Sequence, residues 1–501
     1  MNLKSGLAKV WARWEEKRIN KWTKKGVEIQ KKTLKKLLKE ARHTEFGRDH
    51  NFEEIIDYES YKKAVPIRDY EGLKNYFDQI KNGKENVLWP GKPIYLCKTS
   101  GTTSGTKYIP LTKASFPNHT RSARNALLAY IRHSGSANFL NGKYMFIQGS
   151  PVLDKKGGIL TGRLSGIVAH HIPNYLLRNR LPGMETNSIE DWETKIDTIV
   201  RETQHENMTV LAGIPPWVQM YFEKMLDKTG KNTMLEVFPN LELMVTGGVN
   251  FEPYSSTLDK LIGRKIHYLE TYPASEGFFA YQDTLVNQGL LLLLNEGIFY
   301  EFVKADEIFD ETPTRITIEE VEPGVNYALI INSNAGLWAY LIGDTVKFVS
   351  LDPYRLVVTG RTKHFTSAFG EHVIAEEVEK ALEETVKELA CQIREFSVAP
   401  QVLPPDAKLP YHEWFIEFEK VPKNMEEFRK VLDQKLCQKN SYYSDLIEGK
   451  VLQPLKVSMV KKNGFNEYMK EKGKLGGQNK VARLSNDRKM ADALLSKLES
   501  G

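Results

Sequence analysis

The residues best suited to chemistry lie in the stretch 97–107, where glycines, a series of hydroxyl residues and a closing lysine follow one another between two short apolar runs. Glycines let backbone N–H groups turn toward an anion, hydroxyls add neutral donors, and Lys107 adds a cation. The stretch is not a Walker A motif, because Thr106 precedes the lysine and Tyr108 follows it. Two interpretations stay open, a phosphate-binding loop and a plain polar hairpin.

Further along the chain, charged residues follow predicted strands or glycines. Glu276 comes just after a predicted parallel strand, where open α/β sheets place ligand groups, and Asp344 comes directly after a glycine at a predicted strand end. Arg361 and Lys363 lie at an apparent domain boundary, and Lys480 lies in a glycine-rich basic segment. For each one, an ordinary turn, hinge or loop residue is the competing interpretation.

These stretches need a scaffold of alternating strands and helices. Strand and helix patterns alternate from 189 to 270, which predicts βαβ units and a largely parallel sheet. Residues 290–360 are rich in strands and predict an antiparallel or barrel-like subdomain. Residues 361–501 have the texture of a small α+β domain, so we expect domains at 1–360 and 361–501.

Composition sets the class of protein. The chain has 501 residues, 41% of them hydrophobic, with a net charge of +6. Residues 1–40 hold thirteen Lys/Arg against four Asp/Glu, so their net charge is +9 and the remainder carries −3. Three scattered cysteines do not form a CxxC pair, and no apolar run reaches the length of about 18 residues that marks a membrane helix. These features predict a cytoplasmic protein without stable membrane insertion.

The basic surplus falls in predicted helices over 3–42. Their tryptophans, leucines and isoleucines can form an apolar stripe with lysines between them. Such helices can bind a membrane surface or a nucleic acid, but they more often pack on their own domain. Interleaved glutamates at 15, 16, 28 and 40 weaken the nucleic-acid interpretation.

The order of these stretches resembles the layout of the acyl-adenylate-forming superfamily, and more closely the auxin-responsive-promoter family of acyl-acid amido synthetases in its bacterial branch. The resemblance covers nearly the whole chain. It includes His43-Thr44-Glu45-Phe46-Gly47, Leu88-Trp89-Pro90-Gly91 and the segment 476–480. It implies an α/β fold with a large N-terminal adenylate-forming domain, of mixed or parallel sheets with flanking helices plus a barrel-like β subdomain, and a small C-terminal α+β lid domain.

The resemblance also implies roles for single residues. Lys480 would be the catalytic lysine, Lys363 the hinge, Glu276 the magnesium ligand, and Asp344 the residue that holds the ribose hydroxyls. The implied nucleotide-binding residues are Thr99, Ser100, Gly101, Thr102, Thr103, Ser104, Gly105, Lys107, Gly247, Gly248, Val249, Tyr272, Ser275, Tyr340, Asp344 and Arg361. The chain departs from the family pattern at Pro273, Leu341 and Ala482, none of which supplies a group assigned to catalysis.

The implied activity needs ATP and Mg²⁺. A small carboxylic acid attacks the α-phosphorus of ATP, and an amino acid then takes the acyl group and releases AMP. The acyl pocket would lie within 120–250, around Arg121, Arg124 and the segment 215–217. One alternative is a coenzyme A ligase with the same first step. Another is a non-catalytic protein that binds through its basic N-terminal helices.

Overall fold

The computed structural model of the chain divides into two compact units. Unit 1 comprises residues 1–99, 107–189 and 195–362, and unit 2 comprises residues 100–106, 190–194 and 363–501. The structure describes residues 3–102, 105–172, 177–189, 191–247, 251–286, 288–362, 365–366, 368–371, 373–405, 408–472, 481–485 and 487–499. Each unit has its own sheet and its own buried apolar cluster.

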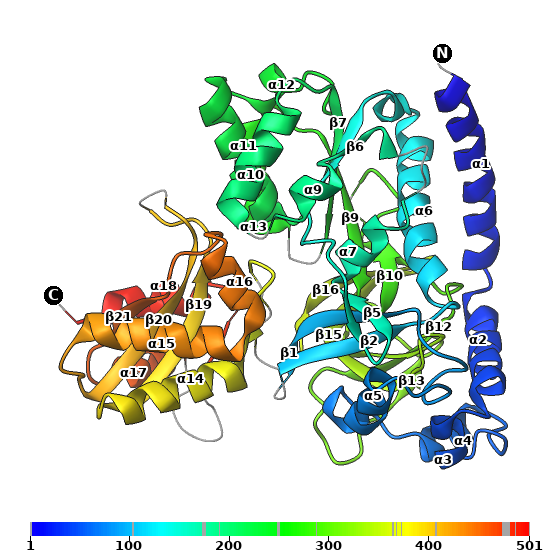
Figure 1. Ribbon diagram of the computed structural model, residues 1–501. Helices are drawn as coiled ribbons and strands as arrows, with labels where there is room; N and C mark the ends of the chain where they lie inside the picture. Colours follow the sequence, from blue (N-terminus) through cyan, green and yellow to red (C-terminus); the bar gives the residue numbers. More distant parts are fainter. Residues whose placement is uncertain are drawn as a thin grey trace. The chain divides into compact units, whose positions relative to one another are not determined.

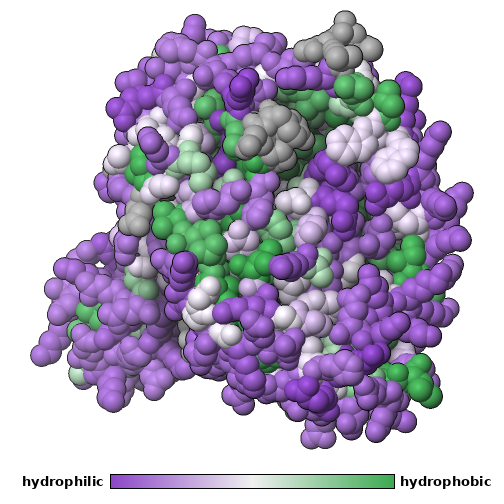
Figure 2. Space-filling view, turned by 45° about the vertical axis from the view of Figure 1, so that its right-hand side comes forward, coloured by the Kyte–Doolittle hydropathy of each residue, from purple (hydrophilic) through white to green (hydrophobic). Residues whose placement is uncertain are grey.

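The N-terminal helices of unit 1 form as the apolar stripe predicts. Leu34, Leu37 and Leu38 recur at helical spacing and are buried together on one face of the second helix. The first helix packs on the long helix that follows residue 115, and Figure 2 turns this side of unit 1 toward the viewer. The helices of this region are α1 (Leu3–Thr23), α2 (Gly26–Ala41), α3 (Glu45–Asp49), α4 (Tyr58–Ala64), α5 (Lys74–Lys81) and α6 (Phe116–Ser134).

The middle of unit 1 contains the predicted parallel strands. The strand order β9-β8-β7-β3-β6 is parallel throughout, with α6 packed on β9 on one side and α10, α11 and α13 on the other (Figure 1). Two prolines begin α11, and Gly230, with a φ of +66°, ends it. The elements are β3 (Lys143–Phe146), β6 (Arg180–Leu181), α9 (Met184–Asn187), α10 (Trp192–Thr203), β7 (Met208–Ala212), α11 (Pro215–Thr229), α12 (Met234–Val237), β8 (Leu243–Gly247), α13 (Glu252–Ile262) and β9 (His267–Ala274).

The strand-rich region continues the same sheet. Its strands pair antiparallel in the order β13-β12-β14-β15-β16-β11-β10-β9, so parallel and antiparallel parts form one sheet of twelve strands. The predicted antiparallel pairing is therefore confirmed, but as an extension of the parallel sheet. The strands are β10 (Gly277–Tyr281), β11 (Leu290–Leu292), β12 (Ile298–Lys304), β13 (Ile316–Thr317), β14 (Asn326–Ser333), β15 (Leu337–Leu351) and β16 (Tyr354–Arg361).

A second, smaller sheet of unit 1 has the strand order β2-β1-β5-β4. The glycine-rich region 157–166 supplies one of these strands and the start of a helix. The elements are β1 (Tyr95–Thr102), β2 (Gly105–Leu111), β4 (Asp154–Lys156), β5 (Ile159–Gly162) and α7 (Leu164–Ala169).

Unit 2 has the predicted α+β texture. A long antiparallel hairpin is extended by a parallel third strand, and Trp414 and Phe415 on its central strand are fully buried. The elements are β17 (Phe365–Thr366), β18 (Val373–Ile374), α14 (Ala375–Glu388), β19 (Gln392–Gln401), β20 (Tyr411–Lys420), α15 (Met425–Lys439), α16 (Ser441–Glu448), β21 (Lys456–Met459), α17 (Gly464–Glu471) and α18 (Lys489–Leu494). The large unit and the smaller α+β unit confirm the predicted α/β architecture.

Candidate functional site

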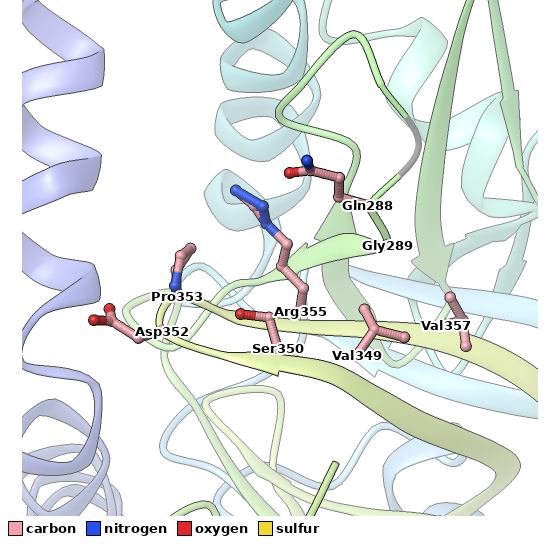
Figure 3. A pocket seen from close by; sticks show the side chains of 8 residues that line it. All are labelled: Gln288, Gly289, Val349, Ser350, Asp352, Pro353, Arg355 and Val357. Carbon is pink, nitrogen blue, oxygen red and sulfur yellow. The ribbon is translucent and has the colours of Figure 1, made fainter. Parts of the chain in front are cut away.

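A pocket of about 770 Å³ lies at the β15–β16 turn beside β11 (Figure 3). Its lining includes Gln288, Ser350 and Arg355, and the guanidinium group of Arg355 pairs with Asp283 at 2.6 Å. None of the residues that line this pocket belongs to the predicted site, so the pocket is not the predicted nucleotide site.

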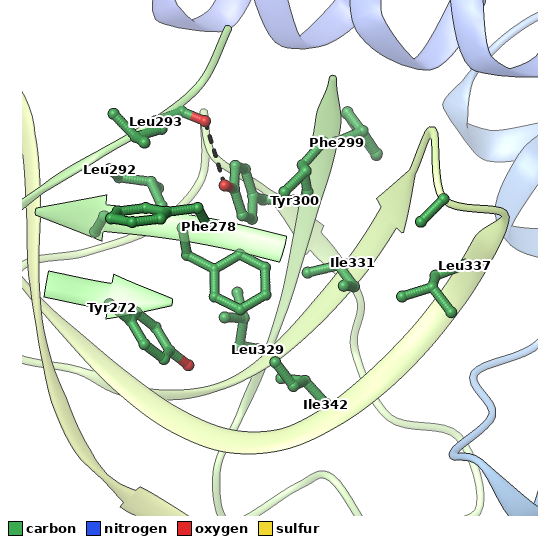
Figure 4. Close-up of a cluster of buried hydrophobic side chains, with 14 of the residues drawn as sticks. Tyr272, Phe278, Leu292, Leu293, Phe299, Tyr300, Leu329, Ile331, Leu337 and Ile342 are labelled. Atoms are coloured by element: carbon green, nitrogen blue, oxygen red, sulfur yellow. Dashed lines mark hydrogen bonds between the residues drawn. The ribbon is translucent and has the colours of Figure 1, made fainter. Parts of the chain in front are cut away.

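The predicted residues of unit 1 meet around Tyr272, near the end of β9. Its ring packs edge-on against Phe279, with 5.0 Å between ring centroids, at the border of the buried core in Figure 4. Residues 272–274 belong to this strand, and Glu276 follows its end after one further residue. The apolar packing of Tyr272 extends the strand, and Ser275 and Glu276 alone form the turn into β10.

Asp344 joins Tyr272 to Arg361. The Tyr272 hydroxyl donates to Asp344 Oδ2 at 2.5 Å, and Arg361 Nε donates to Asp344 Oδ1 at 2.7 Å. Asp344 and Arg361 are directly paired across β15 and β16, so their side chains leave the same face of the sheet. A carboxylate has about four lone-pair sites, so both oxygens can still accept hydrogen bonds from a ligand.

Asp344 lies in the middle of a strand. The expectation of a strand end there is wrong, because β15 runs from Leu337 to Leu351 without a break. Gly343 has a φ of +93°, and the register with β16 shifts just after Thr345. The glycine therefore signals a local distortion of the strand, which sets the direction of the Asp344 side chain.

Glu276 and Lys107 bring opposite charges into this region. Glu276 is buried, and burial raises the pKa of its carboxyl group, while the Lys107 ammonium acts against that shift. Burial likewise lowers the pKa of Lys107, and Glu276 acts against it. Arg361 and Asp344 also act on both groups, so the four charged residues share one electrostatic environment. A carboxylate as buried as Glu276 stays ionised only while nearby cations balance its charge.

Among the described residues, three buried hydroxyl groups have no hydrogen-bond partner, and one of them is the Oγ of Ser122 on α6. The other two lie on strands of the large sheet, the Oη of Tyr340, which is fully buried, and the Oγ1 of Thr246 on β8. The Glu276 carboxylate and the side chains of Tyr70 and Asp69 act electrostatically on the Tyr340 hydroxyl. Buried polar atoms usually find a partner, so these two mark places where a polar ligand group could complete the structure.

Several neighbours of the site carry no signal in the sequence motifs. Tyr70 accepts from the backbone N–H of Tyr108 at 3.1 Å, and Lys107 Nζ lies 5.9 Å from its ring centroid. Burial raises the pKa of the Cys97 thiol most, and the negative charge of Glu276 raises it further, while a hydrogen bond with the Ser275 side chain acts in the opposite direction. Cys97 is the first residue of the stretch 97–107, the Ser/Thr/Gly stretch, and could have been found from that position.

Gly247 is a glycine because β8 and β9 approach closely there. Gly247 pairs with Thr271, and a Cβ added to it would lie 2.5 Å from the Thr271 carbonyl oxygen. The close approach of the two strands therefore explains why the first residue of the predicted stretch 247–249 is a glycine. The next two predicted residues, Gly248 and Val249, lie outside the described residues.

The described parts of the Ser/Thr/Gly stretch are extended. Residues 97–102 belong to β1 and residues 105–107 to β2, so the expectation of a loop across the whole stretch is wrong for these positions. Paired strands form backbone hydrogen bonds that a free loop lacks. This gain favours strand pairing over a loop, so β1 and β2 both reach further into the stretch than predicted. Thr99 is half-buried, and for Ser100, Gly101, Thr102 and Gly105 only the strand assignment is described. The predicted residues Thr103, Ser104, Lys363 and Lys480 lie outside the described residues altogether.

The two arginines expected near the acyl pocket are engaged on the side of α6 that faces α1 and β12. Arg121 pairs with the buried Glu296, and the Arg124 guanidinium lies 4.8 Å from the Trp11 ring centroid. These contacts fasten α6 to its neighbours, so the expected acyl-pocket role is not supported for either arginine.

The donors fit a nucleotide with its magnesium ion better than an all-protein metal cage. Among the described residues, no three or more His, Cys, Asp or Glu side chains are grouped to hold a metal ion. Mg²⁺ commonly binds one or two carboxylates together with substrate phosphates, and the buried Glu276 supplies such a carboxylate. Within the described chain, no helix is long and apolar enough to cross a membrane.

Comparisons with known proteins find similarity over most of the chain. Models of the GH3 family N-terminal, central and C-terminal domains match residues 15–183, 291–361 and 376–489. The jasmonoyl–L-amino acid synthetase JAR4 of Nicotiana attenuata is 23% identical over 396 residues, 65% of this chain and 67% of its own. The indole-3-acetic acid-amido synthetase GH3.3 of Arabidopsis thaliana is 21% identical over 521 residues, 88% and 86% of the two chains.

A solved structure has the same fold. It is AtGH3.15 acyl acid amido synthetase in complex with 2,4-DB, with a TM-score of 0.58 and 16% identity over 94% of both chains.

Proposed function

The chain belongs to the GH3 family, and from this premise we propose that it is an ATP-dependent acyl acid amido synthetase. The observation that carries the proposal is the chain of contacts Tyr272–Asp344–Arg361 with Glu276 and Lys107 beside it. These residues offer acceptors for ribose hydroxyls, a carboxylate for a metal ion and cations for phosphate oxygens in one place. Amido synthetase relatives over most of the chain support the amide-forming step.

The proposed reaction has two halves. In the first, a carboxylate oxygen of a small acid attacks the α-phosphorus of ATP, and pyrophosphate leaves. In the second, the amine of an amino acid attacks the acyl carbon of the mixed anhydride, and AMP leaves as the amide forms. Negative charge gathers on phosphate oxygens in the first half, so cations placed there stabilise the transition state.

The described residues divide this work. Asp344 accepts from the ribose hydroxyls, held in place by Tyr272 and Arg361. Lys107 and Arg361 lie toward the phosphates, and Glu276 holds Mg²⁺, which when bound screens phosphate charge. Lys480, which the structure does not describe, is the proposed catalytic lysine. Residues 361–501 are the proposed mobile domain, with Lys363 as hinge, and cytoplasmic location is part of the same proposal.

The test is a mass-spectrometric screen of the whole protein with ATP, Mg²⁺, mixed small acids and mixed amino acids. We expect AMP, pyrophosphate and a new amide, and coenzyme A supplied in place of amino acids should give no thioester. Lys480→Ala should lower acid-dependent pyrophosphate exchange roughly a hundred- to thousand-fold, the usual cost of losing one electrostatic partner. Equal exchange in both proteins would remove Lys480 from the mechanism. A thioester without amides would replace the proposed acceptor, and no AMP with any acid would count against adenylation.

The placement in a bacterial branch of the family is a separate proposal. It has no support from the two relatives described above, which are plant proteins. A bacterial relative at least 30% identical over the whole chain would support it, and an equally similar plant relative would contradict it.

A further inference from the structure

Helix α1 presents an apolar face that is largely exposed, although the Arg124 guanidinium lies against the Trp11 ring. Leu7, Val10, Trp11 and Trp14 are spaced so that they lie on one side of the helix, and their exposed fractions are 63%, 64%, 40% and 56%. Large apolar side chains are usually scattered singly on a protein surface. Four of them within eight residues on one helix face therefore need an explanation.

The opposite face of α1 is fixed to unit 1. Ser5 and Ala12 are buried, the Ser5 hydroxyl donates to the Ala137 carbonyl at 3.2 Å, and Asn125 donates to Glu15 at 2.9 Å. Arg132 pairs with Glu16 at 2.6 Å. The helix cannot turn its apolar side inward without breaking these contacts, so the exposure is a property of the fold.

The acidic and basic side chains of α1 lie on different faces of the helix. Its two glutamates, Glu15 and Glu16, make the contacts with α6 just described, so they do not lie on the exposed side. Lys17 and Lys21 follow the apolar residues at the same helical spacing and are exposed. In the described part of the chain, neither lysine pairs with a carboxylate. The exposed face therefore passes from an apolar half with two tryptophans into a basic half.

We propose that this face of α1 docks the enzyme on an anionic lipid surface. A helix with aromatic and aliphatic residues beside lysines lies in the headgroup region, with its apolar side chains among the acyl chains and its ammonium groups at the lipid phosphates. Tryptophan is favoured at this depth because its ring is amphipathic.

Two other occupants fit the face less well. A second copy of the chain, docked through the same face, would offer the lysines no carboxylate partner, because Glu15 and Glu16 face α6. A nucleic acid would match the lysines but would leave Leu7 and Val10 without a partner, because its backbone presents phosphates and sugars. The docking does not depend on the proposed reaction, since none of these residues belongs to the candidate site.

The experiment is co-sedimentation of the full-length protein with vesicles of phosphatidylcholine alone or with about a third phosphatidylglycerol, at low and at high salt. We expect binding to the anionic vesicles only, and weaker binding at high salt. Val10→Glu should abolish it, while Val286→Glu, a control at an equally exposed valine of unit 1 (68%), should not. Lys17→Gln with Lys21→Gln should weaken binding about 30-fold, from the usual contribution of two basic residues near such a surface. The matched control is Lys228→Gln with Lys231→Gln, two exposed lysines away from α1.

All variants should keep the near-ultraviolet circular dichroism of the wild type, because every changed side chain is exposed. The proposal is overturned if the wild type ignores anionic vesicles, or if Val10→Glu binds them as the wild type does. It is also overturned if light scattering shows a dimer that Val10→Glu dissociates and that does not bind vesicles. Binding of duplex DNA in place of vesicles would equally refute it.

Discussion

Replacing Asp344 by asparagine tests the centre of the candidate site with little change of shape. The carboxylate receives the Tyr272 hydroxyl at 2.5 Å and Arg361 Nε at 2.7 Å, and in the proposed reaction it also accepts from the ribose. Asparagine keeps one acceptor oxygen but removes the negative charge and places an NH₂ group against one of the two donors. The variant should therefore weaken nucleotide binding more than it weakens the fold.

The magnitudes follow from the exposure of the pair. Hydrogen bonds to charged groups contribute about 1.5–3 kcal/mol each when shielded from water. The Arg361 and Asp344 side chains are 26% and 11% exposed, so solvent screening lowers the contribution of their contact to folding to roughly 1–2 kcal/mol. The lost ribose contact should weaken AMP binding roughly 10- to 100-fold.

The assay is titration calorimetry with AMP, together with urea unfolding of each variant. Asp283→Asn is the matched control, because Asp283 forms a comparable pair with Arg355 at 2.6 Å outside the site. It should lose stability but keep AMP affinity. Tyr272→Phe keeps the ring of Tyr272 but removes the hydroxyl that donates to Asp344. In a double-mutant cycle with Asp344→Asn, the two changes should show a coupling energy of about 0.5–3 kcal/mol in the free energy of unfolding. If Asp344→Asn binds AMP as tightly as Asp283→Asn, Asp344 does not hold the nucleotide.

Two further predictions concern stability. Burial lowers the pKa of His119 to about 4 from 6.5, so the folded protein resists a proton that the unfolded chain accepts. The contribution of neutral His119 to the free energy of unfolding should be fully present above pH 6.5 and should fall by roughly 3 kcal/mol between pH 6.5 and 4. His119→Gln should remove this pH-dependent loss, which urea unfolding at several pH values would measure. An unchanged pH dependence in the variant would contradict this. Gly247→Ala should cost roughly 1–3 kcal/mol, because its Cβ would lie 2.5 Å from the Thr271 carbonyl oxygen. Gly183→Ala, with no atom closer than 3.5 Å to the added Cβ, should be nearly neutral in the same assay.

Much of the fold follows from local patterns in the sequence. The sequence predicts helices over 114–134 and 215–229, and α6 and α11 agree with these bounds to within two residues because apolar periodicity, a proline start and a glycine end act together there. The alternation of strands and helices likewise predicts the parallel strands from β7 to β9. The joining of these strands to the antiparallel part does not follow, because it depends on β9 pairing with β10 through a two-residue turn. Local patterns do not distinguish that hairpin from a domain boundary.

The site is less predictable than the fold, for a reason visible at Tyr340. The segment at Arg68 pairs with β15 there: the Arg68 N–H donates to the Ala339 carbonyl at 3.1 Å, and the Leu341 N–H donates to the Arg68 carbonyl at 2.9 Å. This contact between segments some 270 residues apart in sequence brings Asp69 and Tyr70 to the site, and neither belongs to a motif. Motifs identify residues that act on a ligand, whereas such supporting neighbours are fixed by long-range pairing.

The curvature of the sheet explains how Tyr272 and Asp344 meet. In the strand order β15-β16-β11-β10-β9, four steps separate the two strands, and a flat sheet would hold them about 19 Å apart at the usual strand spacing. The hydrogen bond of 2.5 Å between Tyr272 and Asp344 therefore requires that the antiparallel part curl back on itself, as the barrel-like expectation implies. Figure 4 shows what fills the curl, with Leu329, Ile342 and Tyr300 packed inside it. The apolar core thus sets the distance between Asp344, the proposed acceptor for the ribose, and the Tyr272 ring beside it, so the proposed chemistry depends on side chains that touch no substrate.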